Sequence, residues 1–149
     1  MARSEKRDLP FGGESPAHPV SARVRSQAIL ERLLDRSLAL KFASLSTVDG
    51  RSFAQASARD DDAAAHRIAA MSSSLLALSE SFAREALRGN SSFTTISTEH
   101  GAIVVVRVPT RKRNHVLAIG SDASDVMALT LRYALDAAAE ISAAIDDNS

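Results

Sequence analysis

The sequence predicts a single α/β domain of the α+β kind, with one sheet packed against helices in the order α-β-β-α-β-β-β-α. Three segments carry apolar residues at helical spacing, and five shorter segments have the alternation or β-branched content of strands. A chain of 149 residues has the length of one domain, and 45% apolar with 24% charged residues is ordinary globular composition. One sheet covered by helices is the economical way for such a chain to build a core.

The first helix is expected over residues 20–37, followed by a β-hairpin. The apolar residues of this helix fall on one face, opposite its charged residues: Ala22, Ile29, Leu30, Leu33 and Leu34. Strands are predicted over residues 38–47 and 52–57, because Asp49 and Gly50 between them suit the positive φ angles of a two-residue turn. Residues 1–19 are rich in Pro and Gly among mixed charges and are expected to form a disordered tail.

A long central helix is expected over residues 63–88. Asp60 to Asp62 place carboxylates at its positive end, and Gly89 with Asn90 supplies the usual stop. Strands follow over residues 93–98, 102–108 and 114–120, and a last helix is expected to begin at Ser121 or Asp122. Its apolar stripe consists of Met127, Leu131, Ala134, Ala138, Ile141 and Ile145. The domain is therefore predicted to span residues 20–146, with a short tail at 147–149.

The central helix has three distinct faces. One stripe is expected to form the core contact: Ile68, Met71, Leu75, Leu78 and Phe82. The opposite face is polar. Between them runs a row that we call the small-residue row: Ala65, Ala69, Ser72, Leu76, Ser79, Ala83 and Ala86. Small side chains let a second helix approach closely, and a self-complementary row suits a two-fold dimer. We therefore predict a dimer interface there, the alternative being helix propensity or a fit under a loop of the same chain.

The composition argues against several classes of function. The chain has no cysteine, so disulfides and thiolate metal sites are excluded. Eighteen basic residues balance eighteen acidic ones, which argues against nucleic acid or anionic lipid as partners of the whole molecule. The longest purely apolar run, residues 102–106, is too short to insert into a membrane, and the N-terminus lacks the apolar stretch of a secretory signal. A cytoplasmic location is expected.

No pattern of residues points to catalysis or to a cofactor. There is no G-x-x-x-x-G-K phosphate loop, so the chain is not itself expected to be a GTPase. Four scattered histidines lack metal-ligand spacing: His18, His66, His100 and His115. No serine stands in a G-x-S-x-G elbow. We therefore expect a non-enzymatic protein, without metal or cofactor, that works by binding other chains.

Two features are candidates for contact with a partner. The basic turn Arg111, Lys112 and Arg113 could meet an acidic partner, although a solvated turn that discourages aggregation explains it as well. On the last helix, Leu129 and Tyr133 lie away from the apolar stripe, where they could anchor a partner or the first helix.

The segment Ala-Ala-Met-Ser-Ser-Ser-Leu-Leu-Ala-Leu-Ser-Glu at residues 69–80 resembles the central-helix signature of the roadblock family, the dynein-light-chain type of module associated with small GTPases. Residues 45–51 and 98–104 resemble the two hairpins of that family, and residues 116–119 resemble its last strand. The resemblance covers about residues 22–146. It implies a five-stranded antiparallel sheet between a long central helix and two terminal helices, related to profilin-like and longin layouts.

The resemblance also implies how such a module works. Family members typically dimerise by pairing central helices and sheet edges, and bacterial members are often regulators of Ras-like small GTPases. An exposed arginine donated to a GTPase can accelerate hydrolysis. Four residues are candidates by position alone: Arg59, Arg67, Arg84 and Arg88.

Three functions stay open at this point. The first is a homodimeric GTPase regulator, and the second is a passive dimeric scaffold that leaves nucleotide state unchanged. The third is a small-ligand sensor, which needs a cavity between sheet and helix and is disfavoured by the few polar groups expected on the inner faces. A hydrolase is the weakest option.

Overall fold

The structure is a computed structural model that describes residues 19–58, 62–111 and 114–147. Residues 1–18 of the expected tail, Arg59, Asp60 and Asp61, and Lys112 with Arg113 lie outside these ranges. The elements are α1 (Pro19–Leu34), β2 (Leu40–Thr47), β3 (Ser52–Ser57), α2 (Asp62–Leu87), β4 (Phe93–Thr98), β5 (Gly101–Val108), β6 (His115–Asp122) and α3 (Met127–Asp146). Their order is the predicted one.

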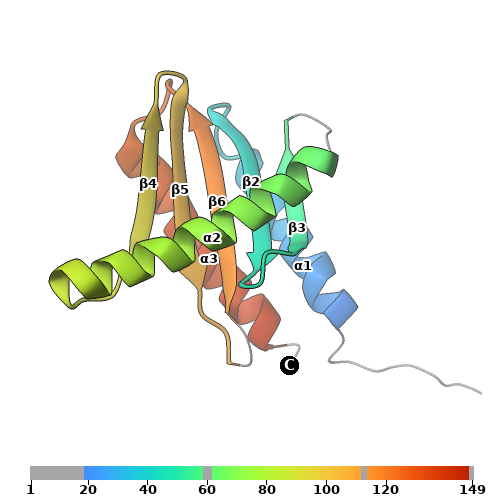
Figure 1. Ribbon diagram of the computed structural model, residues 1–149. Coiled ribbons are helices and arrows are strands. Elements are labelled where there is room, and N and C mark those ends of the chain that lie inside the picture. The colour runs from blue at the N-terminus through green and yellow to red at the C-terminus, as the bar shows by residue number, and fades with distance from the viewer. Residues whose placement is uncertain (1–18, 59–61, 112–113, 148–149) are drawn as a thin grey trace, which may run out of the picture.

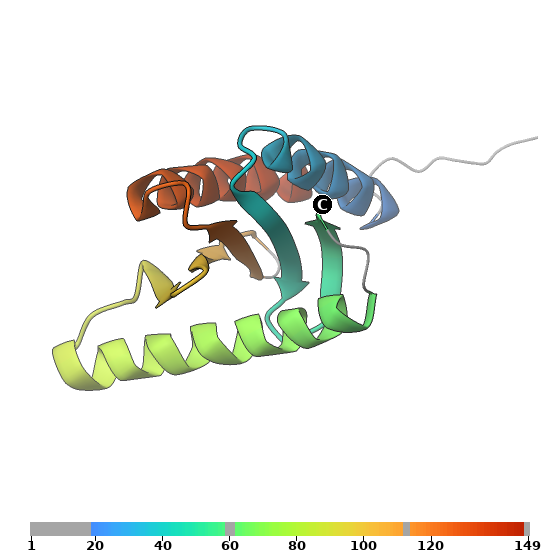
Figure 2. The same ribbon diagram turned by 90° about the horizontal axis from the view of Figure 1, so that it is seen from above.

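The sheet has five strands in the order β3-β2-β6-β5-β4, and every neighbouring pair is antiparallel. α1 and α3 lie side by side over one face, and α2 crosses the other face alone (Figures 1 and 2). The structure therefore confirms the predicted sheet between one central and two terminal helices. Gly50, with φ of 91°, occupies the predicted turn between β2 and β3.

The larger part of the core lies between the sheet and the α1/α3 layer. The predicted apolar face of α1 is buried or half-buried there, and so is the predicted stripe of α3. Side chains of β2, β5 and β6 complete this core, among them Leu45, Val104 and Ile119, which are fully buried. Both terminal helices are held by the hydrophobic contact that their periodicity predicted.

The predicted starting point of the last helix is wrong. β6 continues through Ser121 and Asp122, and α3 begins only at Met127. Ser121 pairs with Leu40 in the sheet, and its hydroxyl lies 2.9 Å from that of Thr130. Asp122 accepts a hydrogen bond from the Ser124 amide at 2.9 Å, which bends the chain directly after the strand. Ser and Asp can stabilise either a helix start or a turn, and here they stabilise the turn.

The end of α2 also differs from expectation. The helix stops at Leu87, and Arg88, not Gly89, adopts the left-handed conformation, with φ of 56°. The Gly89 amide then donates to the carbonyl of Ala83 at 3.3 Å. Gly89 therefore comes one residue after the position at which the chain turns out of the helix. Sequence spacing does not fix a helix end to within one residue.

The small-residue row does not lie open for another chain over its whole length. Four of its members are buried against the chain's own sheet, namely Ala65, Ala69, Ser72 and Leu76. The prediction that these four contact a second copy is therefore corrected. Ser79 and Ala83 are half-buried, and Ala86 is exposed.

Small residues on both elements contribute to this packing, beside the contact of Leu76 with Val105 and Val116. The face of the sheet toward α2 carries Ser44, Ser46, Ala118 and Gly120. Ser73 of α2 donates its hydroxyl to the carbonyl of Thr47 at 2.9 Å, a contact that requires the helix to lie close to β2. The row predicted close approach correctly, but the surface approached is the sheet.

We predict that Ala69→Leu lowers the free energy of unfolding by about 1–3 kcal/mol, because Ala69 is fully buried and a larger side chain would push α2 away from the sheet. Ala77→Leu, at an exposed position of the same helix, should change stability by less than about 0.5 kcal/mol. Urea denaturation followed by circular dichroism measures both. Equal effects of the two substitutions would contradict the assignment of the buried face.

Candidate interaction surface

Large apolar side chains of α2 point into solvent. The exposed fraction is 62% for Met71, 68% for Leu78, 72% for Phe82 and 85% for Leu87. Met71, Leu78 and Phe82 were expected in the core, and that expectation is wrong. Because the row from Ala65 to Leu76 faces the sheet, Met71, Leu78 and Phe82 on the adjacent stripe point sideways or outward.

The C-terminal part of α2 has no sheet beneath it. The helix crosses the sheet obliquely, and its last turns extend beyond β4 (Figures 1 and 2). Residues 84–90 are all exposed. Phe82 and Leu87 therefore belong to a projecting arm of the molecule, where solvated apolar side chains contribute no folding energy.

The neighbouring edge of the sheet is open as well. β4 pairs with β5, and in the described ranges no helix packs extensively against it. Its sequence, Phe-Thr-Thr-Ile-Ser-Thr, has no charged residue and no proline. Phe93 and Ile96, on opposite faces of the strand, are 42% and 38% exposed. An uncharged, β-branched edge of this kind is prone to pair with another strand.

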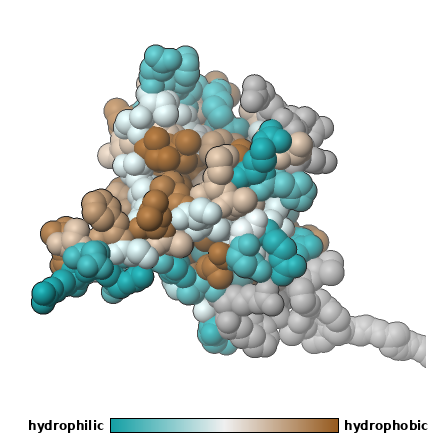
Figure 3. Space-filling model, viewed as in Figure 1, coloured by the Kyte–Doolittle hydropathy of each residue, from teal (hydrophilic) through white to brown (hydrophobic). Residues whose placement is uncertain are grey.

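We call these exposed residues of α2 and β4 the β4–α2 surface: Met71, Leu78, Phe82, Leu87, Phe93 and Ile96. Figure 3 shows apolar residues gathered along α2 and over the adjoining part of the sheet. Phe93 extends this surface around the edge of the sheet to the face opposite α2. Exposed apolar residues gathered around an open strand edge mark interaction sites more often than open surface. The sequence reasoning missed this surface because a spacing of three and four residues identifies an apolar face without saying what covers it.

One ion pair fixes the middle of α2 beside this surface. Arg107 of β5 donates to both carboxylate oxygens of Glu80, at 2.7 and 2.5 Å. The side chains are 32% and 17% exposed, so water screens the pair only partly. The hydrogen bond from Arg107 lowers the pKa of Glu80 below its usual value, and the same bond raises the pKa of Arg107. The bidentate pair holds the projecting arm at a defined angle to the sheet.

The predicted partner-binding residues are not brought together. Arg67 and Arg84 are exposed on α2 and Arg88 is exposed directly after it, whereas Leu129 is exposed on α3, in the other layer. Tyr133 is buried, and the guanidinium of Arg36 lies 4.7 Å from its ring centre, so it stabilises the contact between α3 and the end of α1.

The basic turn is described only in part. Arg111 is exposed, and its amide donates to Asp146 at 3.0 Å, whereas Lys112 and Arg113 lie outside the described ranges. Arg111 lies beside the C-terminal end of α3, away from the exposed arginines of α2 and from Leu129.

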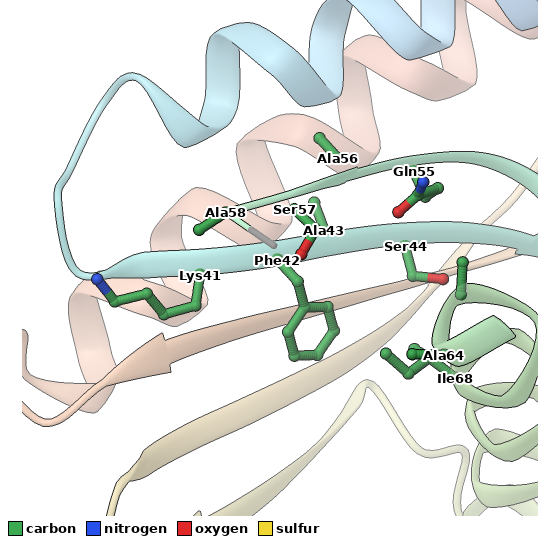
Figure 4. Close-up of a pocket in the computed structure, with 11 residues that line it drawn as sticks. Lys41, Phe42, Ala43, Ser44, Gln55, Ala56, Ser57, Ala58, Ala64 and Ile68 are labelled. Atoms are coloured by element: carbon green, nitrogen blue, oxygen red, sulfur yellow. The ribbon is translucent and has the colours of Figure 1, made fainter. Parts of the chain in front are cut away.

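A cavity of about 330 Å³ lies between β2, β3 and the first turns of α2 (Figure 4). Its walls are mainly apolar and include Phe42 and Ile68, with Ser44 and Gln55 as polar neighbours. The Phe42 ring packs on Gly120 so closely that a Cβ there would lie 2.1 Å from Cε1. Among the described residues, no group of three or more His, Asp or Glu side chains lies close enough together to hold a metal ion.

No protein-family model matches the sequence, and a comparison with curated protein sequences finds no match. Solved structures do resemble it. The Roadblock/LC7 domain from Streptomyces avermitilis has a TM-score of 0.69 at 16% identity, over 77% of this chain and 92% of its own. MglB from Myxococcus xanthus has a TM-score of 0.72 at 14% identity, over 95% and 97%. The chain has the roadblock fold.

A further MglB structure, described as having a tetrameric arrangement, matches with a TM-score of 0.75 at 15% identity, over 87% of this chain and 93% of its own. The resemblance read from residues 69–80 and from the two hairpins is confirmed at the level of the roadblock fold. Within that fold, the β4–α2 surface occupies one sheet edge and the single helix on one face.

We predict that Glu80→Gln destabilises the protein by about 1–2 kcal/mol at neutral pH, because it removes a charged partner of Arg107. The folded-state pKa of Glu80 is lowered, so its contribution is complete above the unfolded value of 4.5 and disappears as pH falls through the folded value. The stability difference between wild type and variant should therefore shrink in acid. Denaturation at neutral and acidic pH measures it.

Glu85→Gln, at an exposed position of the same helix, is the matched control and should be nearly neutral at both pH values. A Glu80→Gln difference that stays constant across the acid range would show that the ion pair does not contribute as described.

Proposed function

We propose that this chain is a homodimeric, non-enzymatic adaptor or regulator of the roadblock type, and that its second partner is a Ras-like small GTPase. The β4–α2 surface carries the proposal. It joins an open, uncharged strand edge to a projecting apolar helix. In a single copy the edge strand lacks a pairing partner and the apolar side chains of the helix stay exposed to water.

A second copy completes both features at once. Antiparallel pairing of β4 with its own copy places a two-fold axis between the strands and extends the sheet across both chains. The arm of α2 that overhangs β4 would then lie above the sheet of the partner, covering Phe82 and Leu87. Ser79, Ala83 and Ala86, the outer members of the small-residue row, are the ones available for this contact.

The GTPase partner rests on resemblance and fold. The predicted roadblock signature implies a Ras-like GTPase, and the MglB structures that share the fold, one of them tetrameric, support a protein that assembles with other chains. Of the helices described here, none is long and apolar enough to cross a membrane. We infer a cytoplasmic regulator that needs no cofactor, with a passive dimeric scaffold as the alternative.

We predict that Phe82→Lys converts the dimer to a monomer, because a charge would be buried at the centre of the contact. A central apolar anchor of an interface contributes about 2 kcal/mol or more to the binding free energy. The dissociation constant of the dimer should therefore rise at least about thirtyfold. Light scattering coupled to size-exclusion chromatography measures the mass. Leu135→Lys, at an exposed apolar position of α3 in the other layer, is the control and should remain dimeric.

If both Phe82→Lys and Leu135→Lys dissociate the dimer, the proposed location of the interface at the β4–α2 surface is wrong. A wild-type chain that is monomeric at all concentrations would refute the dimer itself.

For the second partner, we predict that the chain captures a Ras-like GTPase from its own cell in at least one nucleotide state. Single-turnover GTP hydrolysis with and without the chain then separates the two functions, since a regulator changes the rate and a scaffold does not. Arg67→Ala, Arg84→Ala and Arg88→Ala test whether one exposed arginine acts on the nucleotide, which would lower the rate about a thousandfold without loss of binding. Absence of binding in both nucleotide states would contradict the proposal.

A further inference from the structure

The two edges of the sheet are treated differently by the rest of the molecule. β4 is open, whereas β3, the opposite edge, lies under α1 (Figure 2). We propose that the side chain of Gln27 closes the β3 edge to strand pairing and so limits self-association to β4. This inference rests on the proposed dimer and explains why strand pairing does not continue beyond two copies.

The contact that closes the edge is a pair of hydrogen bonds to one residue. The Gln55 amide donates to Oε1 of Gln27 at 3.0 Å, and Nε2 of Gln27 donates to the Gln55 carbonyl at 2.6 Å. Gln55 lies in the middle of β3, opposite Ser44 of β2. A glutamine side chain presents the same donor and acceptor as a peptide group. Gln27 therefore occupies the position of one residue of an added strand.

The packing of α1 holds Gln27 in place. The neighbouring residues Ser26, Ile29 and Leu30 are buried against the sheet and α3, so the helix cannot turn away without losing core contacts. One turn along, the carboxylate of Glu31 accepts a second hydrogen bond from Nε2 of Gln27 at 3.0 Å. An added strand would have to displace Gln27 from Gln55 before its own backbone could pair there.

A second residue of α1 lies over the same strand. The guanidinium of Arg23 is 4.9 Å from the centre of the Phe53 ring, near the start of β3. On β4, by contrast, no helix side chain of the described residues hydrogen-bonds to the backbone. Covering one edge and leaving the other open is a recognised way to direct strand pairing.

Closure of β3 decides the size of the assembly. A chain with one open edge forms a two-fold dimer in which both open edges are consumed. With two open edges, each dimer would still present a free β3 at either end, and further copies could add without limit. Gln27 therefore acts as a terminator of sheet extension.

The test uses the full chain with Gln27→Ala, followed by sedimentation velocity over a wide concentration series. Wild type should remain one species, and the variant should add species heavier than the dimer as concentration rises. Hydrogen exchange at the Gln55 amide should accelerate about fivefold or more, because its partner is lost. Val24→Ala, at an exposed position of the same helix whose side chain cannot hydrogen-bond to Gln27 or Gln55, is the matched control and should behave like wild type.

The outcomes separate this inference from the proposed dimer. If wild type is a dimer and Gln27→Ala stays a dimer despite faster exchange at Gln55, the closed edge is refuted and the dimer stands. If wild type is a monomer and Gln27→Ala self-associates, the dimer is refuted and the closed edge stands. In the Phe82→Lys background, addition of Gln27→Ala should turn a monomer into a concentration-dependent dimer; a persistent monomer would overturn the inference.

Discussion

The close contact between α2 and the sheet determines most of the molecule's outer form. Ala65, Ala69 and Ser72 on the helix are buried toward the sheet, and Ser73 reaches the backbone carbonyl of Thr47 in β2, so the helix lies close to that strand. Side chains project from a helix in all directions around its axis. When the row from Ala65 to Leu76 faces the sheet, the stripe that contains Met71, Leu78 and Phe82 must face another direction. Burial of the small side of α2 is therefore the physical cause of the exposed side.

The same contact places the other features of the β4–α2 surface. The hydrogen bond from Ser73 to Thr47 and the bidentate pair of Glu80 with Arg107 fix the helix at two points along its length. Its direction across the sheet then brings the last turns past β4. An apolar arm beside an unprotected edge, with the opposite edge occupied by Gln27, leaves one direction for growth of the sheet.

Much of the fold could be predicted from local pattern. The element order, the turn at Gly50 and the buried faces of α1 and α3 followed from periodicity and turn residues, because each depends on neighbours within a few positions. The start of α3 could not be predicted, since Ser121 and Asp122 suit both a helix start and a turn. The choice came from the pairing of Ser121 with Leu40, a residue distant in sequence.

The sequence by itself determined that α2 has one small and one large apolar face, and that β4 is uncharged and prone to pair. Only the tertiary structure decided which face of α2 meets the sheet, and hence that Met71, Leu78 and Phe82 are exposed while Ala69 is buried. Periodicity fixes the angle between two faces of a helix but not the rotation of the helix about its axis. That rotation depends on side-chain volumes on the opposing strands, which come together only in the folded chain.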